Sequence, residues 1–148
     1  NGDGYDDMLA WNQVSDRIEW FALESGIGLV SFGDFLGVQP NQGTVAGLGD
    51  LDADGFDDFA VSSADDGAGG QVHIVYGRSF APASMNLAEV SVLVDGSDSG
   101  GGFGASVSAL GDVNGDMYAD FLVSAPLVDG VGPLLDVGEA YLFLGMGL

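Results

Sequence analysis

The chain has no cysteine and no lysine, and its two arginines, Arg17 and Arg78, stand against 23 acidic residues. The absence of cysteine excludes disulfide bonds and thiolate metal sites. Nucleic acids and anionic membrane surfaces are bound through clustered Lys and Arg, so the formal net charge of −21 excludes both partners. Carboxylates in this excess repel one another unless bound cations or a salty habitat neutralise them, and a divalent metal does so with the fewest ions.

Long apolar runs are also missing. No stretch approaches the roughly 18–20 apolar residues that cross a membrane, which predicts no membrane insertion. Glycine, in contrast, is abundant: 26 glycines beside 4 prolines and 47% hydrophobic residues indicate short strands joined by tight turns rather than a disordered chain. Because the sequence begins without methionine and inside a repeated motif, we expect it to be part of a longer protein.

Internal repetition is the strongest pattern. An aspartate-rich motif occurs as NGDGYDD at 1–7, GDLDADGFDDFAVSSA at 49–64 and GDVNGDMYADFLVSAP at 111–126. When Asn1, Asp52 and Asn114 are aligned, the copies lie 51 and 62 residues apart. Repeats of this length are typical of propellers and arrays. We therefore expect one partial domain over 1–148, with repeats at about 1–37, 38–97 and 98–148, of which the first and last are incomplete.

Apolar stretches with strand-like alternation follow each copy, which predicts an all-β fold of roughly ten short strands. The expected strands are 8–11, 17–23, 27–32, 44–50, 59–61, 71–77, 90–94, 103–112, 121–123 and 139–145. The aromatic residues Trp11, Trp20, Phe21, Tyr141 and Phe143 fall at strand spacing and are expected in the core between blades. The stretch 79–89 is expected to be helical or irregular.

The second copy contains a complete set of ligands for a hard cation. Numbered from Asp50, side-chain oxygens fall at positions 1, 3, 5 and 9, which are Asp50, Asp52, Asp54 and Asp58, and Phe56 at position 7 offers its carbonyl. Alternate spacing lets a tightly wound loop turn every second carboxylate inward, and glycine at position 6 permits the sharp reversal. Calcium takes 6–8 oxygen ligands in flexible geometry, whereas magnesium keeps more water, so the pattern predicts Ca²⁺.

An EF-hand begins with the same spacing and has to be excluded. It requires a bidentate Glu at position 12 and flanking helices. Position 12 is Val61 in the second copy and Val123 in the third, and both are followed by strand-like sequence. The closing carboxylate at position 9 therefore belongs to a different kind of loop.

The other two copies depart from this pattern in one respect each. The third loop offers Asp112, Asn114, Asp116, the Tyr118 carbonyl and Asp120, and the first offers Asn1, Asp3, the Tyr5 carbonyl and Asp7. Met117 stands where the second copy has glycine, and a positive φ there costs about 1 kcal/mol, so we expect the third loop to bind more weakly. Position 1 of the first loop lies before the first residue of the sequence. Asp57 and the pair Asp65–Asp66 are expected to be solvated turn residues rather than ligands.

The third copy is preceded by Phe103-Gly104 and ends in Val123-Ser124-Ala125-Pro126. With these residues in the places of FG and GAP, it resembles the FG-GAP repeat of integrin-α-type β-propellers. The first copy is more similar to the related VCBS repeat of bacterial secreted proteins. The resemblance implies about two and a half tandem four-stranded antiparallel blades, with calcium clamping the hairpin between the first two strands of a blade. It also implies a location outside the cell or at its surface, in a bacterial secreted protein.

Nothing in the sequence indicates catalysis. His73 is the single histidine and lies within a predicted strand, and no G-x-S-x-G motif accompanies it. Two function classes stay open: a non-catalytic adhesion or binding module for a protein or carbohydrate ligand, or an accessory propeller of a secreted phospholipase- or polysaccharide-degrading enzyme. The other expected partners are neighbouring blades. Since propellers close with 4–8 blades, the chain alone is expected to form an open arc that tends to associate.

Overall fold

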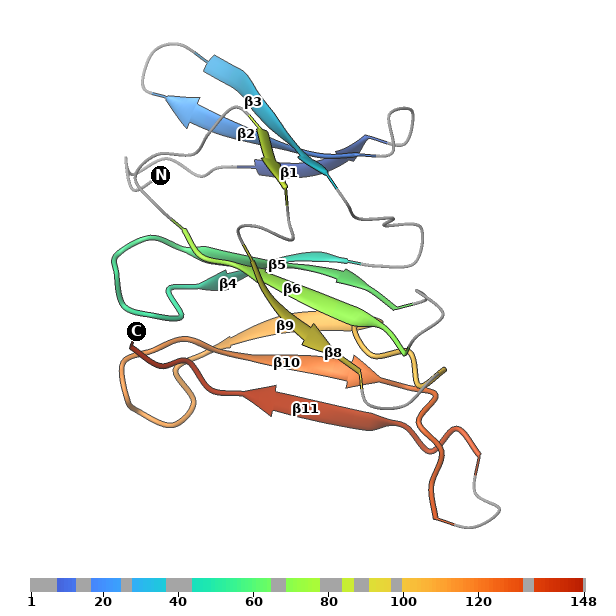
Figure 1. Cartoon of the computed structure of the whole chain (residues 1–148). Coiled ribbons are helices and arrows are strands. Elements are labelled where there is room, and N and C mark those ends of the chain that lie inside the picture. The colour runs from blue at the N-terminus through green and yellow to red at the C-terminus, as the bar shows by residue number, and fades with distance from the viewer. Residues whose placement is uncertain are drawn as a thin grey trace.

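The computed structural model describes residues 8–12, 17–24, 28–36, 44–64, 69–77, 84–86, 91–96, 100–131 and 135–147. These ranges contain β-strands and turns (Figure 1), and none of them holds a helix long and apolar enough to span a membrane. The strands are β1 (Met8–Asn12), β2 (Arg17–Glu24), β3 (Gly28–Leu36), β4 (Val45–Gly49), β5 (Asp58–Ser63), β6 (Gln71–Val75), β7 (Ser84–Asn86), β8 (Ser91–Asp95), β9 (Ser106–Gly111), β10 (Asp120–Ala125) and β11 (Glu139–Phe143).

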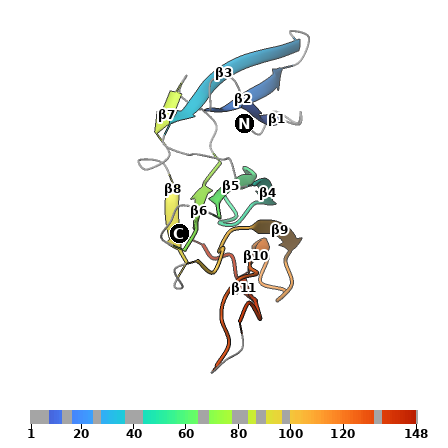
Figure 2. The same ribbon diagram turned by 90° about the vertical axis from the view of Figure 1, so that its right-hand side faces the viewer.

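The strands form three sheets that follow one another in a stack. The first sheet has the order β1-β2-β3-β7, the middle sheet β4-β5-β6-β8, and the third sheet β11-β10-β9. Figure 1 shows the first sheet at one end, the third at the other and the middle sheet between them, and the view turned by 90° in Figure 2 shows the same succession. The expected all-β architecture of open, partial propeller blades is confirmed, and the repeat boundaries stay a prediction.

Two details differ from the expectation. The pair β3 and β7 is parallel, whereas the other strand pairs of the described sheets are antiparallel. The segment expected to be helical or irregular includes β7, a strand of three residues. A strand this short carries almost no periodicity, so alternation could not have revealed it.

The described core lies between the middle and third sheets. Its buried members are Leu48, Ala60, Val72 and Ile74 from the middle sheet, Leu51 from the loop after β4, and Phe103, Val107, Phe121, Val123, Ala125 and Val128 from the third repeat. Burying each larger side chain of this set contributes about 1.5–3 kcal/mol. Tyr141 and Phe143 pack against this core, as their spacing predicted, whereas the side chains of Trp11, Trp20 and Phe21 lie outside the described part of the structure.

Aromatic contacts and a glycine explain why a Phe-Gly pair opens the third repeat. The Phe103 ring meets the Tyr141 ring edge-on with centroids 5.4 Å apart, and the Phe103 N–H donates to the carbonyl of Gly69, just before β6, at 3.0 Å. Gly104 has φ +85°, and a Cβ there would lie 3.0 Å from Ser62 Cβ. Because the left-handed backbone and the close approach both exclude a side chain, the turn locks the third sheet onto the middle one.

Candidate metal site

A buried aspartate begins the second strand of both described repeats and ties the loop to the sheet. In the second loop (50–58), Asp58 accepts N–H bonds from Leu51 and Gly77, each at 2.7 Å. In the third loop (112–120), Asp120 accepts the equivalent bonds from Val113 at 2.8 Å and Gly145 at 2.9 Å. Both carboxylates are buried. A carboxylate has about four lone-pair sites, so two N–H bonds leave each aspartate able to bind a cation as well.

The other aspartate side chains of the second loop accept hydrogen bonds from backbone N–H groups of the same loop. Asp50 accepts the N–H groups of Asp54 at 3.1 Å and Gly55 at 2.9 Å. Asp52 and Asp54 each accept from the N–H two residues ahead, at 3.2 and 2.8 Å. Such side-chain bonds replace the backbone ladder that a loop of this tightness cannot form.

The third loop repeats these bonds and adds two more, from the Gly115 N–H to Asp112 at 2.6 Å and from the Asn114 amide to Asp116 at 2.8 Å. Asp112 accepts the N–H of Asp116 at 3.1 Å and that of Met117 at 2.8 Å, the counterparts of the two Asp50 bonds. Asn114 and Asp116 again accept from two residues ahead, both at 3.0 Å. The N–H bond from Met117 is the largest of several that hold the pKa of the Asp112 carboxyl below its ordinary value.

Each loop adopts a left-handed backbone at two positions, and each supplies glycine at only one of them. The second loop has Ala53 at φ 60° and Gly55 at φ 91°, whereas the third has Gly115 at φ 80° and Met117 at φ 78°. The positive φ expected at Met117 is confirmed. Ala53 puts a comparable strain of about 1 kcal/mol into the second loop, and the weaker binding expected of the third loop stays a prediction.

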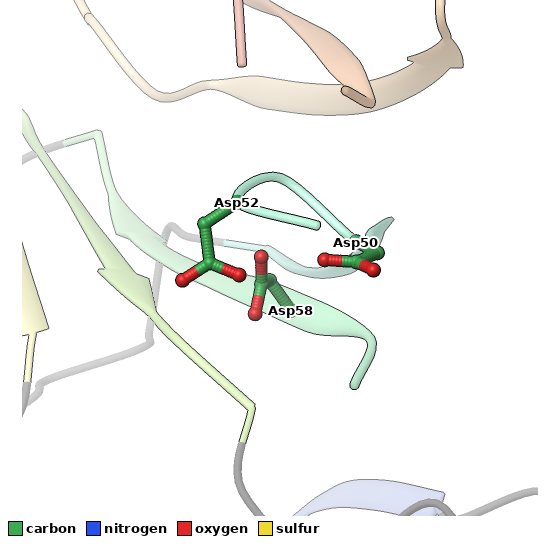
Figure 3. A group of neighbouring side chains, drawn as sticks. All are labelled: Asp50, Asp52 and Asp58. Atoms are coloured by element: carbon green, nitrogen blue, oxygen red, sulfur yellow. The ribbon is translucent and has the colours of Figure 1, made fainter. Parts of the chain in front are cut away.

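Three carboxylates of the second loop converge. Asp50, Asp52 and Asp58 each place an oxygen within 4.8 Å of the others, and Figure 3 shows Asp50 and Asp52 reaching from the loop toward Asp58 on β5. Oxygens bound to one calcium ion at about 2.4 Å lie at most about 4.8 Å apart, so this spacing fits a single ion. The group is composed of hard oxygen donors, the type that calcium prefers. It can therefore hold a metal ion.

The electrostatics of the group favour a cation. Burial raises the pKa of the Asp58 carboxyl to about 6, and the charges of Asp52 and Asp54 add to this rise, although the two N–H bonds oppose it. An ionised Asp58 therefore stands in unfavourable surroundings until a positive charge neutralises the group.

The predicted ligands meet only in part. Asp54 is exposed and outside the group of three, with one oxygen bonded to the Phe56 N–H. In the part of the chain that the structure describes, Asp112, Asp116 and Asp120 do not form a second such group. The first-loop residues Asn1, Asp3, Tyr5 and Asp7 lie outside the described residues.

The sequence did not reveal that each repeat has one glycine whose N–H binds the buried aspartate of its loop. Gly77 and Gly145 follow the third strand of their repeats, and their N–H groups bind Asp58 and Asp120. A Cβ at Gly77 would lie 2.5 Å from the Asp57 carbonyl, so the loop and the strand approach too closely for any side chain. The segments QVHIVYG and EAYLFLG both end in this glycine, and that repetition could have indicated its role.

Comparisons with known proteins agree with this geometry. The model of the FG-GAP repeat family matches residues 103–143. Integrin alpha-4 of Xenopus laevis is 31% identical over 145 residues, which cover 87% of this chain and 14% of that protein. Integrin alpha-PS2 of Drosophila melanogaster is 34% identical over 105 residues, or 65% of this chain and 7% of that protein.

Residues 103–143 carry an FG-GAP repeat, and the open sheets are consistent with partial propeller blades. Over most of its length the chain is distantly similar to integrin alpha chains, of which it spans a small part. Both relatives come from animals, so the bacterial source expected from the first copy finds no support.

Proposed function

We propose that this chain is a calcium-stabilised, non-catalytic FG-GAP module that serves adhesion or ligand binding outside the cell. The observation that carries the calcium assignment is the convergence of Asp50, Asp52 and Asp58. The third loop shares the backbone network of the second, so we assign it a calcium ion as well, with Asn114 in place of one carboxylate. The similarity to integrin alpha chains supports the adhesive role and the extracellular location.

Calcium would act here as a cross-link within each blade. Asp58 is bonded both to its own loop and to the end of the third strand through Gly77. An ion shared by Asp58, Asp50 and Asp52 would neutralise the buried charge and hold the hairpin to the sheet. Binding to the folded state alone raises stability by mass action.

His73 fits a structural role rather than catalysis. It lies in the middle of β6, whose neighbours in the sheet are β5 and β8. Burial lowers the pKa of its imidazole, with Asp95 opposing the shift. The alternative function, an accessory propeller of a secreted enzyme, has no observation in its favour.

Thermal melting in calcium tests the proposal with a matched pair of variants. Asp52→Asn should remove the part of the calcium-dependent increase in melting temperature that the second loop supplies, because it deletes one carboxylate of the converging group. Asp57→Asn makes the same charge change at an exposed position in the same loop and should keep the increase. If calcium stabilises neither the unmodified chain nor the Asp57→Asn variant, the proposed function is wrong.

A further inference from the structure

Two consecutive residues of the second loop each have one group in the candidate metal site and another at the junction with the third repeat. Asp50 contributes its side chain to the converging carboxylates, while its backbone carbonyl accepts the Ala119 N–H at 3.0 Å. The Leu51 N–H donates to Asp58 at 2.7 Å, while the Leu51 carbonyl accepts the Met146 N–H at 3.1 Å. The site and the junction therefore share one stretch of backbone.

The Asp50 carbonyl and the Leu51 N–H belong to the same peptide group. Because a peptide group is planar, its carbonyl and its N–H cannot turn independently. The carbonyl side of this plane is bonded to Ala119 of the third loop, and the N–H side is bonded to Asp58 at the start of β5. A movement of the plane that lengthens one of these hydrogen bonds therefore changes the other as well.

In the third repeat, the two donors of the junction adjoin the residues that anchor the third loop. Ala119 precedes Asp120, and Met146 follows Gly145, whose N–H donates to Asp120 at 2.9 Å. A Cβ at Gly145 would lie 2.8 Å from the Leu51 carbonyl oxygen, so the two repeats approach too closely here for a side chain. The third loop and the end of its sheet thus lie against the second loop, at the same edge of the stack (Figure 1).

In the absence of a cation, carboxylates that repel one another hold this stretch of backbone. Asp50, Asp52 and Asp58 each place an oxygen within 4.8 Å of the others. Like charges at this spacing repel one another, and the burial of Asp58 strengthens the repulsion because less water screens it. Once a cation neutralises the group, the Asp50 side chain is fixed, and so is the peptide group to which the third repeat is bonded.

We propose that calcium held by the second loop also strengthens the junction between the middle and third sheets, so that ion binding in one repeat and docking of the next are coupled. This coupling rests on the proposed function, because it requires an ion in the second loop. By linkage, docking of the third sheet raises the calcium affinity of the second loop by the same factor. The net contribution of one hydrogen bond sets the scale of the coupling, which corresponds to about a threefold to tenfold change in affinity.

Amide hydrogen exchange of the complete chain, measured by NMR, tests the junction directly. The N–H groups of Met146 and Gly138 both donate over 3.1 Å near opposite ends of β11, the first to the second loop and the second to the Val128 carbonyl within the third repeat. Calcium should slow the exchange of Met146 by at least about threefold more than that of Gly138. Asp52→Asn should abolish this difference, whereas Asp57→Asn, the matched control, should keep it.

Calorimetric titration of calcium into two variants of Met146 measures the reverse effect. The Met146 side chain is 68% exposed, and neither variant changes a carboxylate. Met146→Pro removes the N–H that is donated to the Leu51 carbonyl, whereas Met146→Ala keeps it. Met146→Pro should lower the calcium affinity of the second loop, identified as the site that Asp50→Ala removes, by about threefold to tenfold. Met146→Ala should change that affinity by less than about twofold, and circular dichroism establishes that both variants keep the fold.

Three results would overturn the coupling and leave the proposed function intact, because calcium binds in each of them. In the first, calcium slows the exchange of Met146 and Gly138 equally. In the second, the difference persists in Asp52→Asn, which would show that the third loop causes it. In the third, Met146→Pro and Met146→Ala bind calcium alike. If calcium changes neither the melting temperature nor any exchange rate, the proposed function itself is wrong, and the coupling is wrong with it.

Discussion

Replacing Asp58 by Asn should remove one pH dependence from the stability of the metal-free protein. Asp58 is buried at the start of β5, and burial raises its pKa from 3.8 to about 6. The unfolded chain keeps the ordinary value, so the folded state binds this proton more tightly. The stabilising contribution is therefore complete below pH 3.8 and is lost as the pH rises through about 6.

The size of the effect follows from the two pKa values. The whole shift corresponds to on the order of 3 kcal/mol, and one pH unit below a pKa of about 6 the contribution is about 1.4 kcal/mol. Asn does not ionise, so the Asp58→Asn variant lacks this contribution at every pH. Its amide oxygen can accept from only one of the Leu51 and Gly77 N–H groups, a loss of about 1–3 kcal/mol that does not vary with pH.

Urea denaturation, followed by circular dichroism in the presence of a chelator, measures how the free energy of unfolding of the two proteins changes with pH. From about pH 7.5 to pH 5, the free energy of unfolding of the unmodified chain should rise by about 1.4 kcal/mol relative to that of Asp58→Asn. The general relief of charge repulsion and the titration of His73 are common to both proteins and cancel. Parallel pH profiles of the two proteins would refute the raised pKa. In saturating calcium, the free energy of unfolding of the unmodified chain should instead fall as the pH is lowered, because protons compete with the ion for Asp58.

Two matched pairs test the packing around the site. Gly77→Ala should destabilise by at least about 2 kcal/mol in urea denaturation, because a Cβ would strike a carbonyl of the second loop, whereas Gly47→Ala has open space and should be nearly neutral. A similar cost for both glycines would contradict the close approach. Ser62→Ala should cost about 1–2 kcal/mol, since it deletes the buried bond to the Gly104 carbonyl and the bond that Ser62 accepts from the Thr44 N–H. Ser124→Ala should cost less than about 0.5 kcal/mol, and a larger loss there would show that the two serines are not distinguished by the docked sheet.

The repeated motif revealed most of the fold because a blade is specified locally. Alternation and the loop motif predicted β5, β6, β10 and β11 close to their observed bounds, and the spacing of Tyr141 and Phe143 predicted their packing between sheets. The strand β7 was missed since its pairing partner is β3, far away in sequence.

The sequence predicted which residue types form the candidate site, but not which of the aspartates converge. Alternate spacing identified Asp50, Asp52 and Asp58, yet it could not show that Asp54 stays outside the group of three. Sequence also could not show that Ala53 adopts a left-handed backbone, because alanine gives no sign of it.

Calorimetric titration of calcium into three proteins tests the central claim most directly, namely that the second and third loops each bind one calcium ion. The unmodified chain should bind two calcium ions, and the heat signal should fit two sites. Asp50→Ala should weaken one site by at least about tenfold and spare the other, because Asp50 belongs to the converging group of the second loop. Asp112→Ala, at the matching position of the third loop, should do the reverse. If both variants bind calcium as the unmodified chain does, or if the unmodified chain binds none, the calcium assignment of these loops is wrong.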